Sequence, residues 1–244
     1  MPRLYRVVSP HLDDAALSVT KFLGANPGAC LTTVFAAGPD EVSPLPPWDS
    51  LARFFHEGAD VTGIRRAEDQ RAAAMVGASV QHLPFWDGQY RDEDTYGYDG
   101  PDDEDLPDAI ADFLLSESGE PAADAWLIPL GLGHTDHRLA AEGSLLAAER
   151  LLDGAAPDGA EVPDIYVYED LPYAVEYPGE VEERKQDLAD RGFTLEPDDS
   201  LEFREDRAFK RTVFRCHESQ QRLLRWRAKK AIRTRERIWR LQRS

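Results

Sequence analysis

The chain of 244 residues has few cysteines and no long apolar segment. Cys30 and Cys216 lie in otherwise apolar or helical patterns, so we expect two free thiols in a reducing cytoplasm, neither of them a metal ligand. No run of about 18 or more apolar residues is present, so the sequence predicts no membrane-spanning helix. Residues 1–6 are too poor in apolar side chains for a signal peptide, and we therefore expect a cytoplasmic protein.

Basic residues are scarce except at the C-terminal end. The formal net charge is −18, yet residues 222–244 are rich in Lys and Arg and contain one acidic residue, Glu236. An acidic body argues against nucleic acid as the main partner. The dense acidic stretch 92–108 lacks periodicity and predicts a long surface loop, which keeps the protein soluble or acts as a lid.

Apolar side chains in the basic segment 222–243 recur near one helical stripe, which includes Leu224, Ala228 and Ile232. The pattern predicts a basic helix packed on the acidic body or on a second subunit. A homo-oligomer is therefore one of the predicted possibilities. The competing hypothesis is a contact with anionic lipid or nucleic acid.

Short apolar runs alternate with helical patterns along the rest of the chain. We expect strands at 5–9, 30–37, 79–83, 125–130 and 165–168, and helices at 15–24, 65–77, 107–117, 136–152, 179–191 and 205–241. Strands separated by helices predict an α/β fold with a mainly parallel sheet flanked by helices. Without a repeat or a long linker, residues 1–221 are expected to form one domain, with the basic helix 222–244 packed on it.

Two clusters of His and Asp each follow an apolar run. His11, Asp13 and Asp14 come after the first expected strand, and His134 and His137 come after the run 125–130. The carboxyl ends of parallel strands are where open α/β sheets place their ligands. At a helix start, residues three apart share a face, so His11 and Asp14 converge while Asp13 points elsewhere. The alternative is that the two aspartates only complement the helix N-terminus; the second cluster favours a metal site.

The composition of such a site indicates hydrolysis. Two His and one carboxylate leave a ligand position open for water, which is typical of catalytic zinc. Zinc lowers the pKa of that water to about 7, a spare carboxylate acts as general base, and a spare His stabilises the oxyanion.

His11, Asp13 and His137 also satisfy the 2-His-1-carboxylate triad of non-haem Fe²⁺ oxygenases. That alternative gives Asp14 and His134 no role, and a third hypothesis is a non-catalytic binding protein with a Rossmann-like sheet. No Gly-x-Gly-x-x-Gly follows a strand, so a dinucleotide ligand is not expected.

The two motifs, His11-Leu12-Asp13-Asp14-Ala15 and His134-Thr135-Asp136-His137, resemble those of the PIG-L/LmbE superfamily of zinc-dependent N-acetylglucosaminyl deacetylases. The resemblance implies a Rossmann-like fold and hydrolysis of an N-acylated amino sugar or its conjugate. It further implies that His11, Asp14 and His137 bind Zn²⁺, with Fe²⁺ as the alternative ion. Asp13 would be the general base, His134 would stabilise the tetrahedral intermediate, and Asp136 would orient His134 or a neighbouring residue. Leu12, Thr135 and Ala15 depart from the family's usual Pro, Pro and Glu, and the change at Ala15 alters the hydrogen bonding behind the ligands.

Two further residues are expected near the substrate. Asp87, which follows the Phe85-Trp86 pair, is placed to hydrogen-bond sugar hydroxyls, although a turn residue before Gly88 is the plain alternative. His217 lies on an expected helix and would border the pocket or serve in packing. The patterns around His56 and His82 predict structural or surface roles.

Overall fold

The computed structural model describes residues 3–116, 123–155, 162–198 and 206–243. A seven-stranded sheet has the order β3-β2-β1-β4-β5-β7-β6. The strands are β1 (Tyr5–Ser9), β2 (Cys30–Thr33), β3 (Ser79–His82), β4 (Ala125–Pro129), β5 (Asp164–Tyr168), β6 (Phe193–Pro197) and β7 (Ile238–Arg243). All neighbours from β3 to β5 are parallel, and β7 is antiparallel to both β5 and β6. The predicted mainly parallel sheet is confirmed.

The two central strands are apolar along nearly their whole length. β4 is buried at every position and β1 at all but Arg6, as expected for a parallel sheet covered on both faces. Val7 of β1 lies beside Leu127 of β4 in the register of the pair. The chain winds outward from β1 to β2 and β3 on one side, and from β4 to β5 on the other. The boundary between β1 and β4 is therefore a topological switch point, where a ligand site is expected.

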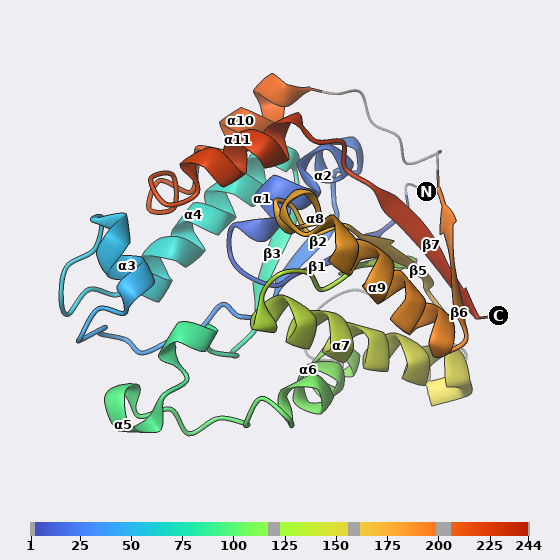
Figure 1. Cartoon of the computed structure of the whole chain (residues 1–244), viewed down its shortest axis with the longest axis horizontal. Coiled ribbons are helices and arrows are strands. Elements are labelled where there is room, and N and C mark those ends of the chain that lie inside the picture. Colours follow the sequence, from blue (N-terminus) through green and yellow to red (C-terminus); the bar gives the residue numbers. More distant parts are fainter. Residues whose placement is uncertain (1–2, 117–122, 156–161, 199–205, 244) are drawn as a thin grey trace.

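Helices cover both faces of the sheet (Figure 1). One layer contains α1 (Asp14–Ser18), α2 (Thr20–Ala25), α4 (Val61–Val76), α10 (Arg207–Phe214) and α11 (Arg225–Arg233), and the other contains α6 (Leu106–Leu115), α7 (Thr135–Arg150) and α9 (Pro178–Asp190). Connecting segments carry the short helices α3 (Pro47–Ala52), α5 (Glu93–Tyr96) and α8 (Tyr173–Glu176), a 3-10 turn (Gly88–Tyr90) and a π turn (Leu151–Ala155). No helix among the described residues is long and apolar enough to cross a membrane.

The C-terminal region differs from the prediction. The expected helix 205–241 is wrong between α10 and α11, where residues 215–224 form turns. It and the expected helix 222–244 are also wrong beyond α11, because the chain leaves the helical conformation after Arg233 and forms β7; residues 205 and 244 lie outside the described part. Leu224, Ala228 and Ile232 are buried as the stripe predicted. Ile238, Trp239 and Leu241 instead follow strand geometry, since the β-branched and aromatic side chains suit a pleated surface and pair with β5.

Smaller differences lie at element ends. The expected helix 15–24 is interrupted at Val19, whose φ of −137° is not helical, and the expected strand 30–37 ends at Thr33. The end of the expected helix 107–117 falls at residue 117, outside the described residues. Residues 92–108 form the predicted surface loop, apart from α5 and the start of α6. β6, which β7 separates from the parallel strands, was not predicted.

Candidate active site

Three side chains converge at the carboxyl ends of β1 and β4. One oxygen of Asp14, Oδ2, lies 3.1 Å from His11 Nδ1 and 3.0 Å from His137 Nε2. Potential ligand atoms of all three residues lie within 4.8 Å of one another, so they could hold one ion. His137 Nε2 is buried and makes no hydrogen bond to the described residues. A buried ring nitrogen left without a hydrogen bond in this way suits a metal ligand once its proton is lost, and the donor set fits a divalent cation.

A carboxylate supports each of these histidines from behind. Asp136 Oδ2 lies 3.0 Å from His11 Nε2, and Asp170 Oδ1 lies 2.7 Å from His137 Nδ1. The backbone N–H of Gly131 donates to the other oxygen of Asp170 at 2.8 Å, from a turn whose φ of +85° favours glycine. Carboxylates on the outer nitrogen fix the ring orientation of metal-binding histidines. Both histidines therefore have the surroundings of ligands.

The electrostatics of the cluster favour exchange of protons for a cation. Burial lowers the pKa of His137, but Asp14 and Asp170 outweigh it and raise the pKa to about 9. Burial also lowers the pKa of His11, yet hydrogen bonds to Asp136 and Asp14 hold it well above its usual value. Burial raises the pKa of Asp14, but His137 and His11 hold it well below its usual range. Without a metal, protons supply the positive charge here, and a bound metal would release them.

His134 stands at the N-terminus of α7 and belongs to a second possible group with His11 and Asp136. This group is a poorer site, because Asp136 already accepts from the Gly88 backbone N–H at 2.8 Å and from Arg91 at 2.5 Å. His134 Nδ1 accepts the backbone N–H of Asp136 at 3.2 Å, so its proton resides on Nε2. Burial and the neighbouring His11 lower the pKa of His134. It is therefore a neutral hydrogen-bond donor at neutral pH.

Asp13 lies apart from both groups. Its Oδ1 is 3.1 Å from Nη2 of the buried Arg65, whose Nη1 is 3.0 Å from Asp87 Oδ2. Burial lowers the pKa of Arg65, but the two carboxylates outweigh it and leave the pKa raised. The guanidinium holds both aspartates in fixed orientations. Since Asp13 belongs to neither of the possible ligand groups, the oxygenase triad of His11, Asp13 and His137 is not formed among the described residues.

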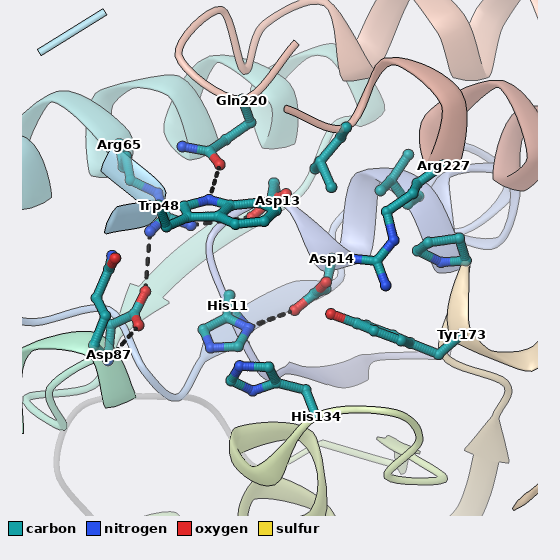
Figure 2. Close-up of a pocket in the computed structure, with 14 residues that line it drawn as sticks. His11, Asp13, Asp14, Trp48, Arg65, Asp87, His134, Tyr173, Gln220 and Arg227 are labelled. Carbon is teal, nitrogen blue, oxygen red and sulfur yellow. Dashed lines mark hydrogen bonds and ion pairs between the residues drawn. The ribbon is translucent and has the colours of Figure 1, made fainter. Parts of the chain in front are cut away.

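A cavity of about 200 Å³ opens in front of these groups. Figure 2 shows His11 and His134 on one side and Trp48 above them. Its lining consists of His11, Asp13, Asp14, Leu17, Trp48, Arg65, Asp87, Gln89, His134, Pro172, Tyr173, Gln220, Leu224 and Arg227. His137 and Asp136 are fully buried behind this surface. The cavity thus presents His11, Asp14 and Asp13 to one small volume, with His137 behind them.

The structure brings most of the predicted residues together. His11, Asp13, Asp14, Asp87 and His134 line the cavity, and His137 and Asp136 support it from behind. His217 is buried away from it, with its ring tilted against that of Phe214 at a centroid distance of 6.2 Å, and does not line the cavity.

Sequence reasoning missed several residues. Asp170 follows the fifth apolar run, 165–168, and its position after a strand is the signal that could have found it. Arg65 and Trp48 carried no such signal, because their elements come to the site only through tertiary packing. The Tyr173 ring packs edge-on against His137, with the ring centroids 4.8 Å apart, and Arg227 lies over the Tyr173 ring at 4.8 Å from its centroid.

Comparison with protein families identifies the family of this chain. The model for GlcNAc-PI de-N-acetylase, PIG-L, matches residues 6–148. The chain belongs to the PIG-L family. The match spans both His/Asp motifs and more than half of the chain, and it confirms the predicted family and the predicted class of enzyme, a deacetylase. Curated protein sequences give no significant match.

Solved structures share the fold of this PIG-L chain. A deacetylase from the teicoplanin biosynthesis pathway has a TM-score of 0.74 at 24% identity, over 99% of this chain and 98% of that one. The A40926 pseudoaglycone deacetylase has a TM-score of 0.70 at 24% identity, with the same coverage. The N,N'-diacetylchitobiose deacetylase of Pyrococcus horikoshii has a TM-score of 0.51 at 14% identity, over 99% and 84%. These similarities confirm the α/β fold.

Proposed function

We propose that this PIG-L protein removes the acyl group from an N-acylated amino sugar or its conjugate, with Zn²⁺ held by His11, Asp14 and His137. The observation that carries the metal assignment is His137 Nε2, a buried nitrogen that makes no hydrogen bond to any described residue and is directed at the oxygen of Asp14 that His11 also approaches. Fe²⁺ suits the same ligands and is the alternative ion.

A divalent ion at this position would polarise the amide carbonyl and lower the pKa of a water molecule to about 7. Asp13 is assigned the role of general base. It lines the cavity beside Asp14, it belongs to neither possible metal group, and Arg65 fixes its carboxylate at 3.1 Å. A base must hold a fixed position within hydrogen-bond reach of the proton that it takes.

His134 is assigned to the oxyanion. Its Nδ1 is occupied by the N–H of Asp136, so Nε2–H is the group left to donate to the substrate carbonyl as negative charge develops. The carboxylates of Asp136 and Asp170 position His11 and His137. Asp87 lines the cavity, and Arg65 holds its Oδ2. Its Oδ1 accepts the backbone N–H of Gln89 at 3.2 Å, and the remaining acceptor capacity of this oxygen is assigned to a sugar hydroxyl.

The experiment that tests this function combines metal content with amine release. Purified protein, loaded with Zn²⁺ or with Fe²⁺ under anaerobic conditions, is incubated with N-acetylglucosamine and its glycosides while free amine is detected. We expect hydrolysis that a chelator abolishes and added metal restores, with the fold unchanged by circular dichroism. Failure to bind either metal after reconstitution would overturn the proposal.

A further inference from the structure

A series of hydrogen-bonded polar groups, buried up to its last member, leads from α4 to the rim of the cavity, and the proposed reaction uses none of them. The carboxylate of Glu68, on α4, accepts the backbone N–H of Ser219 at 2.8 Å and its hydroxyl at 2.7 Å. Both residues are 1% exposed. Desolvating a carboxylate is costly unless hydrogen bonds compensate, so this contact holds the segment around Ser219 firmly against α4.

The hydrogen bonds of this series all run in one direction, because in each of them the donor lies on the side away from Glu68 and the acceptor on the side toward it. Because the Ser219 hydroxyl donates to Glu68, its oxygen is free to accept Nε2 of Gln220 at 3.1 Å. The amide of Gln220 is thereby oriented with Oε1 toward the cavity, where it accepts Nε1–H of Trp48 at 3.1 Å. Directional chains of this kind restrict every member. The last member is an indole, which Figure 2 shows hydrogen-bonded to Gln220 above His11.

Trp48 lies at the boundary between cavity and solvent. It lines the cavity together with His11 and Asp13, yet 37% of it is exposed. Leu51, three residues later on α3 and therefore on the same helical face, is 63% exposed. An indole fixed by hydrogen bonding and extended by apolar surface is a typical binding platform.

The size of the cavity shows which part of a substrate meets this platform. Its volume of about 200 Å³ lies below the range of roughly 300–1,000 Å³ common for drug-sized ligands. A single amino sugar suits this volume, and any group attached to the sugar must leave past the rim that Trp48 forms.

We propose that Trp48 is the platform for an apolar group attached to the amino sugar, and that Gln220 is the positioning residue that holds the indole in place through Ser219 and Glu68. The inference rests on the proposed function and narrows its substrate class to N-acyl amino sugars that carry an aryl or alkyl aglycone. The proposal assigns specificity to residues that take no part in bond cleavage.

The first test compares N-acetylglucosamine with phenyl N-acetyl-β-D-glucosaminide as substrates of the metal-loaded protein. We expect kcat/KM to favour the phenyl compound about 10-fold, the factor that 1.4 kcal/mol of stacking provides. Trp48→Ala should remove this preference through KM of the phenyl compound, and Trp48→Phe should keep part of it. Trp226→Ala is the matched control, since Trp226 is 68% exposed and outside the cavity lining, and it should keep the full preference.

The second test concerns Gln220. Gln220→Leu should reduce the preference in the presence of Trp48 but have no further effect in the Trp48→Phe background, because Phe has no N–H to hold. This non-additivity is a signature of the hydrogen bond that general damage to the fold would not produce. Equal effects in both backgrounds would remove Gln220 from the proposal.

Product binding separates this inference from the proposed function. Glucosamine and phenyl β-D-glucosaminide are the deacetylated products of the two substrates, so they are not turned over. Their dissociation constants for the metal-loaded protein are measured by calorimetry. A Trp48-dependent preference in binding without amine release would keep the inference and overturn the deacetylase proposal. A preference that survives Trp48→Ala, or no preference of the wild type in either assay, would overturn the inference while leaving deacetylation of the bare sugar untouched.

Discussion

His11, Asp14 and His137 stand at the ends of two adjacent strands, whereas Trp48, Tyr173 and Gln220 reach the same cavity from loops and short helices. The first set lies inside the region that matches the PIG-L family model, and Tyr173 and Gln220 lie outside it. A parallel sheet fixes the first set with little freedom, while the second depends on packing between distant segments. Under the proposed roles, one side of the cavity carries the chemistry and the other selects the substrate. Mutations should therefore abolish turnover on one side and change substrate preference on the other.

Removing a ligand should have the largest effect. Asp14→Ala takes away the carboxylate that approaches both histidines, so we expect the metal content to fall from about one equivalent to near zero, with activity lost alongside. Elemental analysis of reconstituted protein and an amine-release assay measure the two quantities. Asp94→Ala, at an exposed position on α5, is the control and should retain both. Full metal occupancy in Asp14→Ala would show that the ion binds elsewhere.

The neighbouring aspartate should separate turnover from metal binding. Asp13→Asn keeps an acceptor for Arg65, so we expect unchanged metal content and a loss of about 10²–10⁴ in kcat, the usual contribution of a positioned base. Steady-state kinetics with parallel metal analysis tests this. Loss of the metal from Asp13→Asn would invert the two aspartate assignments.

His134 should contribute somewhat less, and mainly in the transition state. His134→Ala is expected to retain metal and lose about 10²–10³ in kcat with little change in KM. The same change removes the cap of α7, which costs about 1 kcal/mol of stability. His134→Asn separates the two roles, since Asn is a good cap: its unfolding midpoint should match the wild type while kcat stays low. Recovery of kcat in His134→Asn would contradict the oxyanion role.

The carboxylate behind His137 should affect the affinity for the metal rather than the turnover of the metal-loaded enzyme. Asp170→Asn weakens the hydrogen bond at 2.7 Å that orients the ring, and we expect metal affinity to fall about 10–100-fold. Titration with a competing chelator measures the affinity. Activity should return at saturating metal; a kcat that stays low under saturation would give Asp170 a part in the reaction itself.

A change far from the cavity should leave turnover of the folded protein unchanged. Glu236 lies 3.0 Å from the fully buried Lys210 and accepts backbone N–H groups of Lys21 and Phe22 at the start of α2. Glu236→Gln leaves the Lys210 ammonium without its counter-charge, so we expect a loss of about 3–5 kcal/mol in the free energy of unfolding. Urea denaturation measures it. A stable variant would show that the pair does not anchor the C-terminal segment.

The same contrast explains how much the sequence could reveal. The apolar runs that became β1 and β4, and the His/Asp motifs directly after them, are local patterns, so the parallel sheet and the cluster at its edge could be predicted. β7 could not, because Ile238 and Trp239 also fit a helical stripe and only pairing with β5 decides between the two. Trp48 and Arg65 were missed for a related reason: each reaches the cavity through contacts with residues distant in sequence.

The position of the ion itself is the most direct test of the account. Two groups that share His11 compete for it, one completed by Asp14 and His137 and the other by His134 and Asp136. A crystal structure of the zinc-loaded protein, with anomalous diffraction recorded at the zinc edge, distinguishes them. We predict a single anomalous peak about 2.0–2.2 Å from His11 Nδ1, His137 Nε2 and an Asp14 oxygen. A peak bonded to His134 and Asp136, or to Asp13, would contradict the ligand set and the roles derived from it.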